Sequence, residues 1–258
     1  TPAFLGECPT SKGPGGDSHP EIAEIYDLLS APSLPSSPEP AVVFGRQDKR
    51  VAEATGDLIA SKLLTAVVIT GGIGKDSGTI LSQGFRSEAN WLELQLEKIL
   101  EKPVEQPVIF LDERATNGGE NARFSLRMLR EAGIATASLI AVVHATSARR
   151  LAETLRFESD KKSSKPTIVH TVPTNYPFDP NNLTDRSEAI AEFMRLIEWP
   201  GKGWLHPQTD LPENLVDFAL DTGAKAPPQP SSSTGNILRL VPSKMRPILL
   251  RSAEKHLS

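Results

Sequence analysis

The sequence predicts an α/β fold, in which a doubly wound, mainly parallel five-stranded sheet is followed by a small helical C-terminal part. Short segments rich in Val and Ile are almost continuously apolar, as expected for strands that are buried on both faces. Segments with apolar residues at helical spacing separate them. Because strand and helix alternate along the chain, we expect parallel strands joined by right-handed crossovers.

The expected elements follow in order along the chain. The strands are expected at residues 41–44, 66–70, 108–111, 139–143 and 167–172. Helical spacing of apolar residues occurs at Val51, Ala54 and Leu58, at Leu92, Leu96 and Ile99, at Ala122, Leu126 and Leu129, at Ala148, Leu151 and Leu155, and at Ile190, Phe193, Met194 and Ile197. A further short helix is expected at residues 21–29, before the first strand. The pattern leaves the order of the strands in the sheet open.

The domain organisation follows from composition. Residues 1–18 and 222–236 are rich in Gly, Pro and Ser and contain too little apolar surface to order themselves. We therefore expect a disordered tail at 1–18, a ligand-binding domain at 19–183, a small helical part at 184–221, and a linker and tail at 222–258.

Charge and cysteine content narrow the class of protein. The net charge is −4 and the chain shows no basic stripe with interleaved aromatic residues, which argues against a nucleic-acid partner. Cys8 is the only cysteine, so an internal disulfide and a cysteine-based metal cage are excluded, and a reducing, cytoplasmic location fits best. No apolar run approaches the ~20 residues that cross a bilayer. The chain begins with Thr1, which leaves open that a leader has been removed.

The densest group of polar residues, 111–125, lies between an expected strand and the following helix. In an open α/β sheet, ligands bind beyond the carboxyl ends of the strands, where Asp112, Glu113, Thr116 and Asn117 would project beside unpaired helix N–H groups. A structural alternative explains part of this pattern, because Asn117 as N-cap and Glu120 three residues later form a capping box.

A glycine-rich segment, 70–78, follows the second expected strand. Its glycines allow a ligand to approach the backbone closely, so it is either a cradle for phosphate or carboxylate or a flexible surface turn. The dinucleotide fingerprint fails, because Ser77 stands where its third glycine belongs. The P-loop pattern fails as well, because Asp76 follows Lys75 in place of Ser or Thr.

Two further residues, His144 and Glu88, are candidates for chemistry. His144 closes the fourth expected strand and His170 lies within the fifth, so His144 is a candidate general acid or base. A structural role for a lone histidine at a strand end is the alternative. Glu88 begins a helix after the N-cap Ser87. Its carboxylate either interacts favourably with the helix dipole or binds a ligand amine or hydroxyl. No metal-ligand spacing accompanies either histidine.

Several segments together resemble the SanA, ElyC and YdcF domain family, and most closely its YdcF branch. They are residues 41–45, 69–74, 86–89, 113–125 and 149–150. The resemblance implies a Rossmann-like α/β domain with a small helical C-terminal part and, in the YdcF branch, binding of S-adenosyl-L-methionine. The ligand shell that it implies is Gly45, Gly71, Gly72, Gly74, Glu88, Glu113, Thr116, Asn117 and Asn121.

Two departures from the family pattern bear on function. Many relatives outside the YdcF branch carry a histidine just before the arginine that follows the fourth strand, whereas this chain has residues 146–148, Thr-Ser-Ala, there and His144 earlier. The membrane helices of SanA and ElyC have no counterpart in the sequence.

Three functions remain open at this point. The first is binding of S-adenosyl-L-methionine or a related nucleotide-like small molecule at the carboxyl edge of the sheet, with Asp112 or Glu113 available to a ribose hydroxyl. The second is a transferase or hydrolase in which Glu113 or His144 carries the proton. The third is a module that binds protein partners in cell-envelope assembly.

Overall fold

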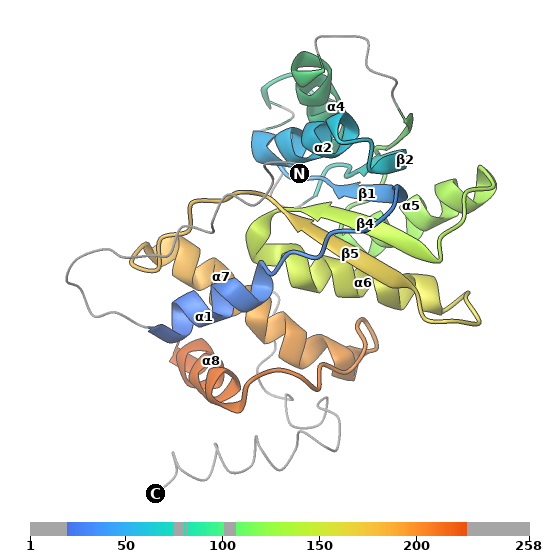
Figure 1. The fold of residues 1–258 in the computed structure, drawn as a ribbon. Coiled ribbons are helices and arrows are strands. Elements are labelled where there is room, and N and C mark those ends of the chain that lie inside the picture. The colour runs from blue at the N-terminus through green and yellow to red at the C-terminus, as the bar shows by residue number, and fades with distance from the viewer. Residues whose placement is uncertain (1–19, 75–79, 81, 101–106, 226–258) are drawn as a thin grey trace, which may run out of the picture. The chain divides into compact units, whose positions relative to one another are not determined.

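Figure 1 presents a computed structural model of the chain, which describes residues 20–74, 80, 82–100 and 107–225. The predicted tail at 1–18 lies outside the described residues. Within them the chain divides into two compact units. One comprises residues 30–177, and the other comprises residues 20–29 together with 178–225.

The first unit contains a five-stranded sheet in which all neighbouring strands are parallel. The strands are β1 (Glu39–Phe44), β2 (Leu64–Thr70), β3 (Val108–Asp112), β4 (Ser138–Val143) and β5 (Ile168–Pro173). Their order across the sheet is β3-β2-β1-β4-β5. The predicted doubly wound, Rossmann-like α/β fold is therefore confirmed, and the strands lie where the apolar runs place them.

Helices cover both faces of this sheet, which explains why the strands are apolar throughout. The helices are α2 (Lys49–Ala60), α4 (Glu88–Ile99), α5 (Gly118–Glu131) and α6 (Ala148–Asp160), with the short 3₁₀ helix η1 (Ala145–Ser147) before α6. Ala41 and Val43 of β1 pack toward α2 and α4, whereas Val42 and Phe44 pack toward α5 and α6. Figure 1 shows α2 and α4 on one side of the sheet and α6 on the other.

The strand order fixes where a site can form. Successive strands run outward from β1 to β2 and β3, after which the chain returns to place β4 on the other side of β1. The topological switch point therefore lies between β1 and β4, and the carboxyl ends of all five strands meet at one edge.

The second unit is helical. It consists of α1 (Pro20–Leu29), α7 (Leu183–Glu198), the 3₁₀ helix η2 (Trp199–Lys202) and α8 (Glu213–Lys225). Ile25 and Leu29 of α1 pack against Phe193 and other apolar residues of α7 and α8, and the ring of Tyr26 stacks on that of Phe178 at 4.1 Å.

This division differs from the predicted one at three points. The apolar face of α1 is buried against helices near the other end of the chain, so α1 groups with the C-terminal helices, although the sequence placed it in a domain at 19–183. The second unit begins at Phe178. Helix α8 continues to Lys225, four residues into the segment predicted as linker, and residues 226–258 lie outside the described residues. In the part of the chain that the structure describes, no helix has both the length and the apolar character needed to cross a membrane.

Among the described residues, one buried hydroxyl in the core of the first unit lacks a hydrogen-bond partner. The hydroxyl of Ser125, on the sheet-facing side of α5, is buried and makes no hydrogen bond among the described residues. Because an unsatisfied buried hydroxyl destabilises the folded state, we expect Ser125→Ala to raise the free energy of unfolding by about 1 kcal/mol. Urea denaturation measures this. The control is Ser159→Ala, which deprives the Thr167 hydroxyl of its acceptor at 2.9 Å and should lower stability. A loss of stability in both variants would contradict the assignment.

Candidate functional site

The backbones of two glycines meet where β1 and β2 end. The Gly45 N–H donates to the Thr70 carbonyl at 2.6 Å, and a Cβ on Gly45 would lie only 2.6 Å from the same oxygen. Gly71 has φ +143, and a Cβ on it would lie 3.0 Å from the Gly45 Cα. The close approach of the chain to itself therefore requires both glycines, whether or not a ligand is bound.

Glu88, the first residue of α4, lies over these two glycines. Its Oε2 would be 2.9 Å from a Cβ on Gly45 and 3.2 Å from one on Gly71. The structure thus brings together three members of the ligand shell that the family resemblance implies. A carboxylate, rather than an empty cradle, faces the glycine backbones.

The first N–H groups of α4 already have hydrogen-bond acceptors within the chain. Ala89 N–H donates to the Gly71 carbonyl at 2.8 Å, Glu88 N–H to the Gly72 carbonyl at 3.3 Å, and Asn90 N–H to the hydroxyl of the N-cap Ser87 at 2.9 Å. These donors are consequently engaged and do not form an open anion site. Gly74 is the last described residue before the gap at 75–79, so the rest of the predicted cradle lies outside the described residues.

Gly72 joins the loop after β2 to the loop after β3. Its N–H donates to the Ala115 carbonyl at 2.6 Å, and a Cβ on Gly72 would lie 2.6 Å from the Glu113 carbonyl and 2.8 Å from that of Ala115. The two loops are therefore packed backbone to backbone, which places Glu113 beside the start of α4.

Glu113 is held by two donors from the segment before α4. The Ser87 hydroxyl donates to its Oε1 at 2.9 Å, and Arg86 Nε lies 3.5 Å from the same oxygen. The Glu113 side chain is 32% exposed, while that of Arg86 is 71% exposed. Glu113 is thus a positioned carboxylate that solvent or a ligand can reach.

Asp112 and Asn121 lie beneath this surface. The Thr70 hydroxyl donates to Asp112 Oδ2 at 2.9 Å and lies 3.3 Å from Asn121 Oδ1, and all three residues are buried. Arg114 Nε approaches Asp112 Oδ1 at 3.4 Å from an exposed position. The cluster ties β2, β3 and α5 together, so the more exposed Glu113 is the better placed of the two acids to meet a ligand.

Thr116, Asn117 and Glu120 form the cap of α5. The Asn117 side chain accepts from Glu120 N–H at 3.0 Å, and Glu120 Oε2 accepts from both the N–H and the hydroxyl of Thr116 at 2.8 Å. The capping box expected from the sequence is present, except that Glu120 reaches the N–H of Thr116 rather than that of the N-cap. Helix capping accounts for Thr116 and Asn117 without a ligand.

This cap should give stability a pH dependence. The backbone N–H of Thr116, followed by its hydroxyl, stabilises the charged carboxylate and lowers the pKa of Glu120. A group whose pKa is lower in the folded state contributes stability that is present above its unfolded pKa and is lost as the pH falls through the folded pKa. We expect Glu120→Gln to unfold with a flatter pH dependence than wild type between pH 6 and pH 3 in urea titrations. Identical slopes would contradict this account of the cap.

His144 lies at the topological switch point. Its Nε2 is 3.4 Å from Asp48 Oδ2 and its Nδ1 is 2.9 Å from the Thr146 hydroxyl, while the ring packs edge-on against Tyr176 at 4.7 Å between centroids. Arg50 contacts Asp48 at 3.1 Å and lies over the Tyr176 ring at 4.9 Å. His144 thereby connects the loops after β1, β4 and β5. Its side chain is only 2% exposed.

Sequence reasoning did not find Asp48 or Tyr176. Asp48 reads as an ordinary N-cap, a role that it also fills by accepting from Arg50 N–H at 3.0 Å. Its contact with His144 depends on β1 and β4 being neighbours, which the pattern could not establish. His170 lies within β5 in register with Ile140 and contacts Ser33 at 3.3 Å, so it belongs to a different level of the sheet from His144.

The described residues hold no group of three or more His, Cys, Asp or Glu side chains arranged to bind a metal ion. Chemically, the edge combines buried and half-buried carboxylates with exposed arginines. No protein-family model matches the chain, and no curated protein gives a significant match. The resemblance to the SanA, ElyC and YdcF family therefore stays a prediction from the sequence.

Proposed function

We propose that the chain binds S-adenosyl-L-methionine or a related nucleotide-like small molecule at the carboxyl edge of β1, β2 and β3. The observation that supports this most is the convergence of Gly45, Gly71, Gly72, Glu88 and Glu113 from three separate loops. In open α/β sheets this edge is where ligands bind.

The chemistry of the edge favours a ligand rich in hydrogen-bond donors over a phosphate. The first N–H groups of α4 already have acceptors, while the Glu88 and Glu113 carboxylates are acceptors only. S-adenosyl-L-methionine offers ribose hydroxyls, an ammonium group and a positively charged sulfonium. When bound, it would supply an activated methyl group.

Little free energy is lost when ligand contacts replace the ion pair between Arg86 and Glu113. Because Arg86 is 71% exposed, its pair with Glu113 contributes only about 0–1 kcal/mol. A ligand hydroxyl or ammonium could therefore replace Arg86, while Ser87 keeps the carboxylate in place. Glu113 would accept from the ribose or amine, and Glu88 would hold the opposite side of the ligand above Gly45 and Gly71.

Calorimetric titration with S-adenosyl-L-methionine tests this proposal. We expect saturable binding that Glu88→Gln and Glu113→Gln each weaken about tenfold, as for loss of a charge-assisted hydrogen bond. The matched control is Glu53→Gln, an exposed residue of α2 paired with Lys49, which should bind as wild type does. Absence of binding at millimolar ligand, or equal affinity in all variants, would sink the proposal.

A transferase or hydrolase is the second candidate, because His144 lies between Asp48 and Thr146 at the switch point. Proton-transfer sites use a histidine that a carboxylate orients through one ring nitrogen, with a hydroxyl at the other ring nitrogen. Both ring nitrogens already have partners, so a substrate would have to displace one of them. Glu113, which is more exposed, is the alternative proton carrier. In a methyl transfer the acceptor nucleophile takes the methyl group and gives up a proton, and S-adenosylhomocysteine is released. This product, measured by mass spectrometry with cell extract present as the source of the acceptor, should fall in His144→Gln or Glu113→Gln if that residue takes the proton.

A further inference from the structure

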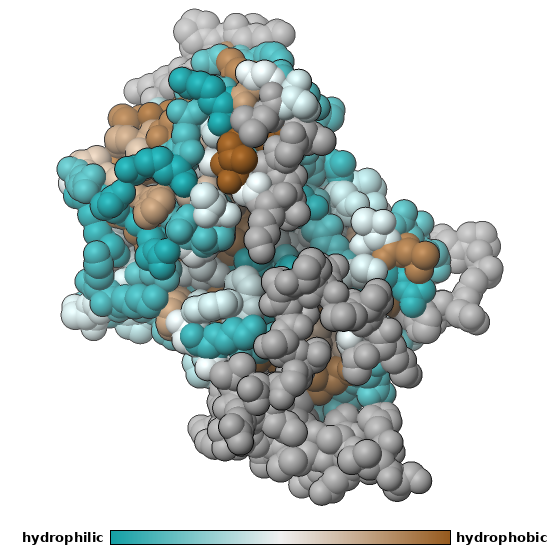
Figure 2. All heavy atoms as spheres, turned by 180° about the vertical axis from the view of Figure 1, so that it is seen from behind, coloured by the Kyte–Doolittle hydropathy of each residue, from teal (hydrophilic) through white to brown (hydrophobic). Residues whose placement is uncertain are grey.

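A shallow pocket of about 210 Å³ lies on the outer surface of α5 and α6. Its lining contains five cationic side chains and one carboxylate, together with two apolar residues: Arg123, Arg127, Arg130, Lys161, Lys162, Glu158, Phe124 and Leu126. None of these residues belongs to the carboxyl-edge site. Figure 2 shows the molecule from behind the view of Figure 1, with mostly hydrophilic residues and scattered hydrophobic patches on that face.

Helical spacing creates this basic surface. Arg123, Arg127 and Arg130 lie three to four residues apart and so form a stripe along one face of α5. Lys161 and Lys162 follow directly after α6. No basic stripe was expected from the sequence, because the cations come from two segments that only the fold brings together.

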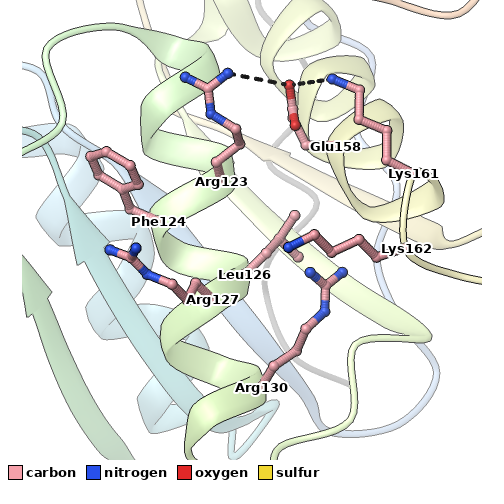
Figure 3. Close-up of a pocket in the computed structure, with 8 residues that line it drawn as sticks. All are labelled: Arg123, Phe124, Leu126, Arg127, Arg130, Glu158, Lys161 and Lys162. Carbon is pink, nitrogen blue, oxygen red and sulfur yellow. Dashed lines mark hydrogen bonds and ion pairs between the residues drawn. The ribbon is translucent and has the colours of Figure 1, made fainter.

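The charges in the pocket are incompletely balanced. Glu158 forms ion pairs with both Lys161, at 2.8 Å, and Arg123, at 4.0 Å. Arg130 and Lys162 have no acidic partner within 4.0 Å among the described residues, and Figure 3 shows their side chains extended toward one another. Facing cations repel, and an anion placed between them removes that repulsion.

The size of the stripe limits the kind of anion. From Arg123 to Arg130 the helix rises only about 10 Å, which is too short for the track of contacts that a nucleic-acid backbone uses. Several cations around one small hollow suit a compact ligand with adjacent phosphates. The ring of Phe124, with Arg127 at 5.2 Å and Arg114 at 5.4 Å from its centroid, adds an aromatic wall flanked by guanidinium groups.

We propose that this pocket binds a compact polyphosphate, held by Arg130 and Lys162 in the centre and by Arg123, Arg127 and Lys161 around them. Cations at the last turn of a helix are also favourable to its dipole, and that role alone would explain Arg130 and Lys162. The absence of an acidic partner for these two residues, in a concave site, favours a ligand.

Calorimetric titration of the full chain with inorganic tripolyphosphate tests the proposal. We expect binding that weakens steeply with added salt and that Arg130→Ala with Lys162→Ala weakens about tenfold or more, as for loss of charge-assisted contacts. The control is Lys49→Ala with Lys98→Ala, which removes the same charge from exposed positions on α2 and α4. Its affinity should stay within about twofold of wild type, since α2 and α4 lie on the opposite face of the sheet from α5 and α6 and salt screens distant exposed charges.

Two further measurements sharpen the result. Glu158→Gln removes the only carboxylate of the lining and should tighten binding severalfold. Competition of ATP and of inositol hexakisphosphate against tripolyphosphate distinguishes a nucleotide source of the phosphates from an inositol source.

No binding by wild type, or equal weakening in the two double variants, would overturn the proposal. Titration with S-adenosyl-L-methionine should be unchanged in the Arg130 and Lys162 variant, which separates this site from the carboxyl edge.

Discussion

Replacing Gly72 by alanine is expected to lower the free energy of unfolding by about 3 kcal/mol, near the upper end for overpacking. The added Cβ would lie 2.6 Å from the Glu113 carbonyl oxygen and 2.8 Å from the Ala115 carbonyl oxygen. Both obstacles are backbone atoms, so neither can rotate away. Relief requires the loops after β2 and β3 to separate, which also breaks the Gly72 to Ala115 hydrogen bond. Urea denaturation measures the loss.

The matched control is Gly119→Ala, near the start of α5. The nearest atom to a Cβ there is Asn117 Oδ1 at 3.4 Å. Because alanine is the better helix former, this variant should be as stable as wild type or up to about 1 kcal/mol more stable. If Gly72→Ala were as stable as Gly119→Ala, the backbone packing described for the two loops would be wrong.

Thr70→Val is expected to have the second largest effect, a loss of about 2 to 3 kcal/mol. The Thr70 hydroxyl donates to Asp112 at 2.9 Å, and the Asp112 side chain is fully buried. Valine keeps the shape of threonine but leaves a buried carboxylate oxygen without that donor. An unpaired buried charge is far more costly than an unpaired neutral group.

A second buried threonine supplies the control. Thr55 donates to the Val51 carbonyl at 2.7 Å inside α2, a neutral hydrogen bond, so Thr55→Val should lose only about 1 kcal/mol. Asp112→Asn should reduce the effect of Thr70→Val in a double-mutant cycle, because it removes the charge that needs the donor. Additive effects in that cycle would contradict the coupling.

The strands and most helices could be predicted because their signals are local and strong. Val42 and Val43 face opposite helical layers, so both must be apolar, and the same holds along β4. The grouping of α1 with α7 could not be predicted in this way. The apolar face of α1 could pack against any apolar surface, and only the complete fold shows that Ile25 packs in the same cluster as Phe193.

The candidate site was predictable to the extent that it is local. The capping box at Asn117 and Glu120 lies within one turn, so the sequence contains all of it. The contact of His144 with Asp48 depends on the order of the strands, which parallel apolar runs do not encode. The sequence also placed Asp112 and Glu113 together at the edge. In the structure Asp112 is buried and Glu113 is partly exposed, because side chains alternate along an extended chain.

We propose that the loops after β1, β2 and β3 form one small-molecule site, with the loop after β4 beside it. Hydrogen–deuterium exchange followed by mass spectrometry, with and without saturating S-adenosyl-L-methionine, tests whether these loops bind the ligand together. We expect slower exchange in residues 45–48, 71–74 and 113–117 together, and unchanged exchange in the Arg130 and Lys162 region. Protection confined to one of these loops, or found only elsewhere in the chain, would contradict it.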